Sequence, residues 1–407
     1  MHVISIGGGA ASFFFAAELV SRRQDCHVTI LEQGTEVLNK VRISGGGRCN
    51  VTHHCFDPAA LIDHYPRGGE ELLAPFTQFG PRETVAWFEQ RGVQLKAEAD
   101  GRMFPVTDSS TTIIDCLTRS CGGGKVKVCT RSKVVNIRPV RDGMGGFAVH
   151  LLKGTPVHAD RLFVAPGGSK QIWQVLGHLG MRIVDPVPSL FTFQIRDERI
   201  AGLAGVSVPD VRLAVEGMDL ESRGPLLITH RGMSGPAILK MSAWGARALQ
   251  AVRYQCSLII DFLPELDYSA IRNWRDEHAK RLLGNHQVTG LPKRLNTRLL
   301  ECAGLDGTKK FATLSNREMD LLCETLKSAR FTVHGQNRFK EEFVTAGGVD
   351  LEEINLASFG SRRFPRMYLA GEVLNIDGVT GGFNFQAAWT GAWLAAQSLG
   401  SEEQDVA

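Results

Sequence analysis

Two glycine-rich segments near the start of the chain have the residue types and spacing to bind phosphate groups. The first, Gly7-Gly8-Gly9-Ala10-Ala11-Ser12, follows the alternating apolar run His2–Ile6. The run Phe13–Arg23 has apolar residues at helical spacing, and a second apolar run, His27–Leu31, leads to Glu32. Strand, glycine turn, helix, strand and acidic residue in this order are typical of a dinucleotide-binding βαβ unit.

The residues of this first segment have separate predicted roles. Gly7 permits a tight turn, and Gly9 allows a pyrophosphate to approach the backbone at the positive N-terminus of the helix. Glu32 is expected to accept hydrogen bonds from an adenosine ribose. Ser12 stands where a third glycine or alanine usually packs the helix on the strand. We favour dinucleotide binding over an incidental glycine turn, with contacts from Gly7, Gly9, Ala10, Ala11, Ser12, Glu32 and Gln33.

The second segment runs from Lys40 to Thr52 and contains Ser44-Gly45-Gly46-Gly47-Arg48-Cys49-Asn50. Three consecutive glycines expose several backbone N–H groups, and Arg48 adds a fixed positive charge. Such a segment could hold the second half of a pyrophosphate or a ribityl chain. The alternative is a mobile surface loop.

The chain resembles the BaiN/RdsA (YhiN-like) family of NAD(P)/FAD-dependent oxidoreductases over nearly its whole length. The resemblance rests on SGGGRCNVT at 44–52 after GGGAAS, and on THRGMSGPAIL at 229–239. It rests also on LPKRL at 291–295, TAGGV at 345–349 and GEVLNIDGVTGGFNFQAAW at 371–389. It implies an α/β fold with a Rossmann-type FAD-binding domain of glutathione reductase-like topology. An inserted β-barrel-like domain and a small helical domain would interrupt that domain.

The resemblance also implies further contacts with FAD, including one from the backbone of Val134 to the adenine. A final helix begins near Asn384, and its first N–H groups would stabilise negative charge on a reduced flavin. The alternative is a C-terminal docking helix. The chain departs from the family pattern at Pro166, Asn375 and Phe383, and its loop after Ser169 is shorter. The implied contacts are Lys40, Ser44, Gly45, Gly46, Gly47, Arg48, Asn50, Val134, Gly371, Glu372, Asp377, Gly381, Gly382, Phe383, Asn384 and Phe385.

The chain carries one dinucleotide fingerprint and no second one for NAD(P)H. We therefore expect FAD to be held permanently and NAD(P)H to dock transiently as electron donor. The leading hypothesis is a reductase of an activated C=C bond, for which the resemblance implies uridine in ribosomal RNA, giving dihydrouridine, or enone-type steroids. The alternatives are an aminoacetone-type amine oxidase and a non-catalytic flavin-bound factor of RNA or the ribosome.

Reduction of a C=C bond needs a proton donor, and three residues are candidates for contact with the substrate or for this role. Cys49 lies beside the predicted flavin loop, although a small buried packing residue is the interpretation we favour. His230 and Arg231 are the other candidates. A base within folded RNA would also have to turn out of its stack to reach the flavin.

We predict three domains. Residues 1–187 and 341–407 form a discontinuous FAD-binding domain, because the opening fingerprint and the closing glycine motif must meet on one cofactor. Residues 188–262 with 328–340 form a β-rich inserted domain, and residues 263–327 form a helical cap that we expect to lie over the flavin. The prolines of Asp185-Pro186-Val187-Pro188 predict a linker.

Residues 272–310 hold nine Lys and Arg residues against four Asp and Glu residues, whereas the whole chain has a net charge of only +3. This excess could engage RNA phosphates, with Lys293 and Arg294 as candidate substrate contacts. The alternative is a solvated helical face.

The composition excludes several classes of protein. With 407 residues, 43% hydrophobic and 22% charged, the chain is neither disordered, fibrous nor a disulfide scaffold. The nine cysteines form no CxxC pair, so we predict no metal site and reduced thiols in a cytoplasmic protein. We expect no membrane span and no secretion signal, and the oligomeric state is left open.

Overall fold

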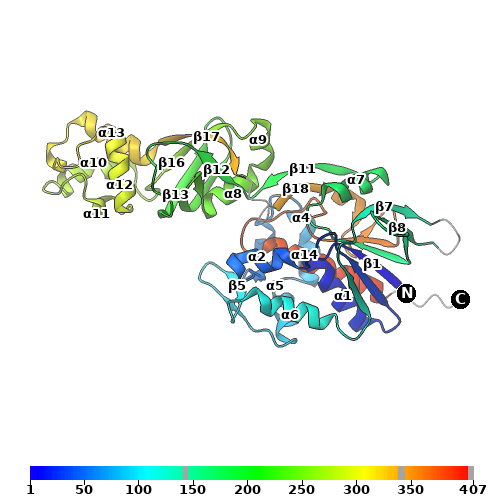
Figure 1. The fold of residues 1–407 in the computed structure, drawn as a ribbon. Helices are drawn as coiled ribbons and strands as arrows, with labels where there is room; N and C mark the ends of the chain where they lie inside the picture. Colours follow the sequence, from blue (N-terminus) through cyan, green and yellow to red (C-terminus); the bar gives the residue numbers. More distant parts are fainter. Residues whose placement is uncertain (141–144, 338–343, 402–407) are drawn as a thin grey trace. The chain divides into compact units, whose positions relative to one another are not determined.

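The structure is a computed structural model that describes residues 1–140, 145–337 and 344–401. The chain forms two compact units: Met1–Val187 together with Val344–Ala407, and Pro188–Phe343. Figure 1 shows the elements of each unit. The α/β fold with an inserted barrel and helices is confirmed, whereas the division into three domains stays a prediction.

A seven-stranded sheet forms the centre of the first unit, in the order β19-β20-β21-β10-β1-β2-β6. Strand β1 pairs in parallel with both β2 and β10, so that Ile6 lies opposite Leu31 and Val164. The glycine segment that follows Ile6 therefore begins at the carboxyl edge of the sheet, where open α/β sheets bind ligands. The strands are β1 His2–Ile6, β2 His27–Leu31, β6 Val126–Cys129, β10 Arg161–Val164, β19 Ile354–Asn355, β20 Gly360–Ser361 and β21 Met367–Leu369.

The first and last helices of this unit, α1 (Ala10–Arg22) and α14 (Phe383–Ser401), pack against each other (Figure 1). The rings of Phe14 and Trp389 lie 5.2 Å apart between centroids. A Cβ added at Gly371 would lie 3.7 Å from the methyl group of Ala388 and 3.9 Å from that of Ala11. Small residues thus allow the two ends of the chain to meet at the carboxyl edge of the sheet.

The buried amide of Gln386 fixes α14 to the segment that follows the second glycine cluster. Its Oε1 accepts hydrogen bonds from Thr52 Oγ1 at 2.6 Å and from Thr84 Oγ1 at 2.9 Å. Its Nε2 donates to Thr390 Oγ1 at 3.1 Å. Trp389 Nε1 donates to the carbonyl of Val51 at 2.9 Å. All the polar atoms of the Gln386 side chain are satisfied inside the protein, as buried polar groups require.

The other elements of the first unit cover this sheet or extend it. A three-stranded antiparallel sheet, β7-β8-β9, follows the edge strand β6, and a second small sheet has the order β3-β5-β4. The helices are α2 Asn39–Gly47, α3 Pro58–Ile62, α4 Gly69–Gln78, α5 Pro81–Glu89, α6 Ser110–Ser120 and α7 Lys170–His178. The strands are β3 Thr52–His53, β4 Leu95–Ala97, β5 Arg102–Pro105, β7 Val134–Pro139, β8 Phe147–Leu151, β9 Val157–Ala159, β11 Ile183–Ser189 and β18 Val344–Val349.

The second unit contains a closed six-stranded barrel and helices, which come between the last three barrel strands in the sequence. Alternating residues of the barrel strands are buried and share one apolar cluster with the helices, from Phe191 to Val333. The strands are β12 Thr192–Ile195, β13 Ser207–Val215, β14 Glu221–Thr229, β15 Gly232–Ser234, β16 Cys256–Asp261 and β17 Ala329–Asn337. The helices are α8 Pro236–Trp244, α9 Ala246–Ala251, α10 Tyr268–Glu277, α11 His286–Thr289, α12 Lys293–Cys302 and α13 Asn316–Lys327.

The predicted linker at residues 185–188 is not irregular, because these residues lie within strand β11, which pairs with β18. The boundary between the two compact units nevertheless falls within it, between Val187 and Pro188. Proline is tolerated there because a two-stranded sheet leaves one edge of each strand unpaired. The second glycine segment is not entirely a loop, because a helical turn starts at Asn39 and breaks at Ser44–Gly46. The predicted boundary between residues 340 and 341 lies outside the described residues.

We predict that Gln386→Leu lowers the free energy of unfolding by about 2–4 kcal/mol, because the hydroxyls of Thr52 and Thr84 lose a buried acceptor. Urea unfolding followed by circular dichroism measures this change. Gln397→Ala on the same helix is the control and should stay within about 0.5 kcal/mol. Equal stability of Gln386→Leu and wild type would show that the network does not hold α14.

Candidate functional site

The first glycine segment combines tight packing with open space. Gly7 has a φ of +101°, and a Cβ there would lie 2.5 Å from the carbonyl oxygen of Ala165. A Cβ at Gly9 would meet no atom within 4 Å, and no side chain caps the N-terminus of α1. The first N–H groups of α1 therefore face space that an anion such as a pyrophosphate can enter.

The carboxylate of Glu32 holds the first glycine segment in place through hydrogen bonds. Its Oε2 accepts from the N–H of Gly8 at 2.7 Å, and its Oε1 accepts from the N–H of Gly34 at 2.6 Å. Each carboxylate oxygen has a second lone pair, so both remain able to accept a ribose hydroxyl. Glu32 therefore has a structural role in addition to the ribose contact predicted for it.

A small pocket adjoins Glu32 on the side of the predicted adenine contact. Glu32, Gln33, Val134 and Gln171 are among its lining residues. The Nε2 of Gln171 donates to the carbonyl of Val134 at 2.9 Å. An adenine that contacts this carbonyl must share it with Gln171, which the sequence interpretation missed.

The second glycine segment has left-handed backbone at all three glycines, with φ of +58° at Gly45, +69° at Gly46 and +87° at Gly47. A Cβ at Gly46 or Gly47 would meet no atom within 4 Å. The backbone of this segment is therefore open to a ligand, as predicted. Gly45 is the exception, because a Cβ there would lie 2.7 Å from the ring of Phe104.

Arg48 is engaged with protein groups. Its guanidinium lies 2.5 Å from Glu98 Oε1 and 3.5 Å from Asp108 Oδ1. Its Cζ atom lies 3.9 Å from the centroid of the Phe104 ring. The Arg48 charge is thus balanced by carboxylates, which favours holding the loop over serving as a free cation for phosphate.

Contacts join the second glycine segment and Lys40 to the closing motif. The side-chain amide of Asn50 is oriented so that both its oxygen and its nitrogen form hydrogen bonds. In this orientation its oxygen accepts a hydrogen bond from the N–H of Gly382 at 3.0 Å. Lys40 forms an ion pair with Glu372, whose Oε1 also accepts from the N–H of Thr345 at 3.0 Å. The structure therefore brings the predicted residues of segments 40–50 and 371–382 together.

The loop before α14 is held by its own side chains. Asp377 is fully buried, and its Oδ1 accepts from Nε of Arg67 at 2.5 Å. The amide of Asn384 accepts from the N–H of Gly378 at 2.9 Å and donates to its carbonyl at 2.8 Å. The side chains of Asp377 and Asn384 thus hold the loop in shape. If this loop binds the cofactor, as predicted, these two residues contribute by positioning the backbone of the loop.

Two histidines lie beside the start of α14 and were missed by sequence reasoning. The Phe383 ring stacks with His64 at 4.2 Å and with His53 at 4.7 Å between centroids. Burial lowers the pKa of His53, which keeps its imidazole neutral near pH 7. The sequence signal that could have identified His53 is its position three residues after Asn50. Phe385 stacks on Trp389 within the same helix.

Cys49 is fully buried and has a left-handed φ of +63°. Burial raises the pKa of its thiol to about 12. A buried, protonated thiol fits the packing role that we favoured.

The remaining candidates lie in the second unit. His230 and Arg231 are exposed at the turn between β14 and β15. Lys293 and Arg294 are exposed at the start of α12, and Arg294 donates to the carbonyl of Gly202. Arg294 therefore supports the packing of α12, whereas Lys293 is the better candidate for contact with a substrate.

The geometry of the first unit fits FAD. Open N–H groups at both glycine segments suit a pyrophosphate, and the Glu32 carboxylate suits a ribose. The Oδ1 of Asn375, beside the closing motif, is buried without a hydrogen-bond partner among the described residues. That oxygen could accept a hydrogen bond from a ribityl hydroxyl.

Residues 1–398 match the family described as "HI0933-like protein Rossmann domain". The chain is 31% identical to the "Ribosomal RNA dihydrouridine synthase" of Escherichia coli over 408 residues, 97% of either chain. It is 29% identical to the "3-dehydro-bile acid delta(4,6)-reductase" of Clostridium scindens over 413 residues, covering 98% of this chain and 99% of that one. The crystal structure of 3-ketosteroid delta1-dehydrogenase from Sterolibacterium denitrificans aligns with a TM-score of 0.50 and 13% identity, covering 98% and 99% of the two chains. That last likeness concerns the fold alone.

None of the helices in the described residues has the length and apolar character needed to cross a membrane. The described residues contain no group of three or more His, Cys, Asp or Glu side chains placed to hold a metal ion.

We predict that Glu32→Ala weakens FAD binding by about 10- to 150-fold, because charge-assisted hydrogen bonds contribute ~1.5–3 kcal/mol. Glu32→Gln should lose less, since it keeps one acceptor oxygen. Equilibrium titration of the apoprotein with FAD, followed by flavin fluorescence, measures the affinities. Glu36→Ala, which removes an exposed carboxylate nearby, should leave the affinity unchanged. Wild-type affinity in Glu32→Ala would mean that the fingerprint has been misread.

We predict that Cys49 of the folded protein resists iodoacetamide at pH 8, because only the thiolate reacts and the thiol pKa is about 12. Exposed Cys302 should be alkylated and serves as the internal control. Peptide mass spectrometry before and after unfolding reports both sites. Rapid native labelling of Cys49 would contradict its assignment as a buried packing residue.

Proposed function

The chain belongs to the HI0933-like family of Rossmann-domain proteins and is an FAD-dependent oxidoreductase, and from this premise we propose that it reduces uridine in ribosomal RNA to dihydrouridine. The observation that carries the proposal is the convergence of three segments far apart in the chain, 7–12, 44–50 and 371–382, in the first unit. Similarity to a ribosomal RNA dihydrouridine synthase along almost the whole chain supports this substrate.

FAD, when bound, supplies the transfer of a hydride from NAD(P)H to one carbon of the substrate double bond. Residues of the chain would orient this cofactor and stabilise its charge. The Glu32 carboxylate would hold the ribose, and the N–H groups at Gly9 and Gly46 would hold the pyrophosphate. The N-terminus of α14, at Phe383, would stabilise negative charge on the reduced cofactor. We include NAD(P)H as the transient donor because the chain carries one dinucleotide fingerprint.

The proton for the neighbouring carbon has to come from a group that the substrate can reach. Cys49 does not meet this requirement, because its thiol is fully buried. We therefore propose that water or an exposed group donates the proton. Exposed His230 stays a candidate on the second unit.

We further propose that ribosomal RNA contacts the basic helical segment of the second unit, through residues such as Lys293. Several of its cations are already paired, including Arg272 with Asp320 and Lys309 with Glu318. Lys293 has no ion-pair partner within the described ranges, which leaves its charge available for a phosphate. An RNA substrate places the protein in the cytoplasm.

Similarity to a bile acid reductase favours one alternative, the reduction of a small-molecule enone. The same catalytic unit would serve, because an enone and uridine both present a C=C bond conjugated with a carbonyl. The substrate then has to be distinguished by assay, since both reactions consume one NAD(P)H for each bond reduced.

The proposal is tested by anaerobic NADPH and NADH oxidation with the FAD-loaded protein. Ribosomal RNA from cells that lack this protein should stimulate oxidation, whereas the same RNA from cells that contain it should not, because its uridine is already reduced. Stimulation by an enone steroid alone would favour the small-molecule reductase. Hydrogen peroxide release from aminoacetone in air would identify an amine oxidase, and failure of every substrate would favour a non-catalytic flavin-bound factor.

A further inference from the structure

Several segments of the first unit carry positive charge that the proposed cofactor site does not use. Described residues 121–140 and 145–159 contain six Lys and Arg residues and no Asp or Glu. Lys170, at the start of α7, adds a seventh cation. None of the seven forms an ion pair within the parts of the chain that the structure describes. They are Lys125, Lys127, Arg131, Lys133, Arg138, Lys153 and Lys170.

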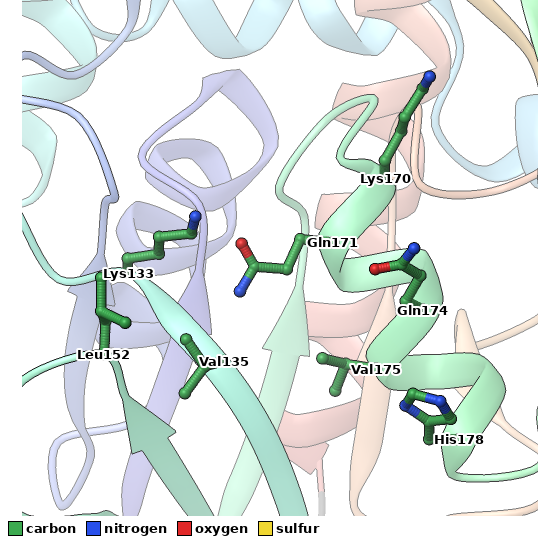
Figure 2. A pocket seen from close by; sticks show the side chains of 8 residues that line it. All are labelled: Lys133, Val135, Leu152, Lys170, Gln171, Gln174, Val175 and His178. Carbon is green, nitrogen blue, oxygen red and sulfur yellow. The ribbon is translucent and has the colours of Figure 1, made fainter.

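A pocket of about 570 Å³ lies between strand β7 and helix α7, and Lys133 and Lys170 are among its lining residues. It is a depression open to solvent and not an enclosed cavity. Figure 2 shows the side chains of Lys133 and Gln171 directed toward the same space. Val135 and Val175 also line the pocket. Lys170 and His178 lie at the two ends of the helix, and the Lys170 side chain is directed away from Lys133.

The side chains that line the pocket are of the types that bind a nucleotide of single-stranded RNA. Lys133 and Lys170 match phosphates, and the exposed amide of Gln174 can hydrogen-bond a base edge. The side chains of Val135 and exposed Leu152 offer an apolar surface to the face of a base, whereas Val175 is buried.

The pocket adjoins the predicted adenosine site, because Gln171 lines both pockets. The adenosine end of FAD is uncharged, however, and its pyrophosphate is assigned to the glycine segments. A pair of lysines is therefore unnecessary for FAD, whereas it complements a polyanion. Lys127 on the edge strand β6 has a simpler explanation as protection against strand pairing, so the argument rests on Lys133 and Lys170.

We infer that the pocket between β7 and α7 binds a single-stranded segment of the RNA substrate, with phosphates at Lys133 and Lys170 and a base edge at Gln174. This inference rests on the proposed function for the identity of the polyanion. It adds a contact surface on the FAD-binding unit itself, separate from the helical segment of the second unit.

The test uses the FAD-loaded full-length protein and fluorescein-labelled oligouridylate, with affinity measured by anisotropy at several salt concentrations. Lys133→Gln/Lys170→Gln should weaken binding at least tenfold. It should also reduce the slope of log affinity against log salt by about 1.4, since each phosphate contact on a single strand contributes ~0.7. Gln174→Ala should weaken binding about fivefold, the effect of losing one hydrogen bond.

Arg119→Gln/Lys240→Gln is the matched control, because it removes two exposed cations that do not line this pocket. It should keep the wild-type affinity and slope. FAD content, read from the absorbance spectrum, should be the same in all variants.

Wild-type affinity and slope in Lys133→Gln/Lys170→Gln would overturn the inference. A parallel loss of FAD in that variant would also overturn it, because the pocket would then belong to the cofactor. Neither result affects the proposed function, which is tested by NAD(P)H oxidation with ribosomal RNA.

Discussion

Burial of the Gln386 amide against the segment after the second glycine cluster is the constraint on which the site depends. Hydrogen bonds from Thr52 and Thr84 fix the rotation of α14 about its axis. The hydrogen bond from Trp389 to the Val51 carbonyl fixes the position of α14 along that axis. The N-terminus of α14 is thereby held beside Asn50, while its later turns pack on α1. Segments separated by most of the chain thus form one edge, where backbone N–H groups face open space.

In this arrangement, most charged side chains of the site hold its loops in place. The groups left to bind an anionic ligand are mainly backbone N–H groups. Arg48 with Glu98 and Arg67 with Asp377 hold loops in place, and Glu32 holds the glycine turn. Backbone N–H groups of a fixed loop need no reorganisation to bind an anion, which is the condition for stabilising charge effectively. The substrate is selected by other surfaces, because nothing in such an edge distinguishes RNA from an enone.

The sequence predicted the first βαβ unit closely, since β1 and β2 lie where the alternating apolar runs placed them. It also identified the glycine segments that meet at the sheet edge, because glycine spacing reports local backbone geometry directly. It could not reveal how the polar side chains are used. The acceptors of Arg48 and Arg67 lie 50 and 310 residues away, and Gln386 binds Thr52 across 334 residues. Such pairings follow from tertiary packing, as does the extended path of residues 185–188, where two prolines predicted a linker.

The most direct test of the account is mass spectrometry of ribosomal RNA from cells with and without this protein. Reduction of one C=C bond adds two hydrogen atoms, so the account predicts one uridine heavier by about two daltons only where the protein is present. A variant with Glu32→Ala should lower the occupancy of that modification in proportion to its loss of FAD. Ribosomal RNA of identical mass in both strains would contradict the claim that this flavoprotein reduces uridine.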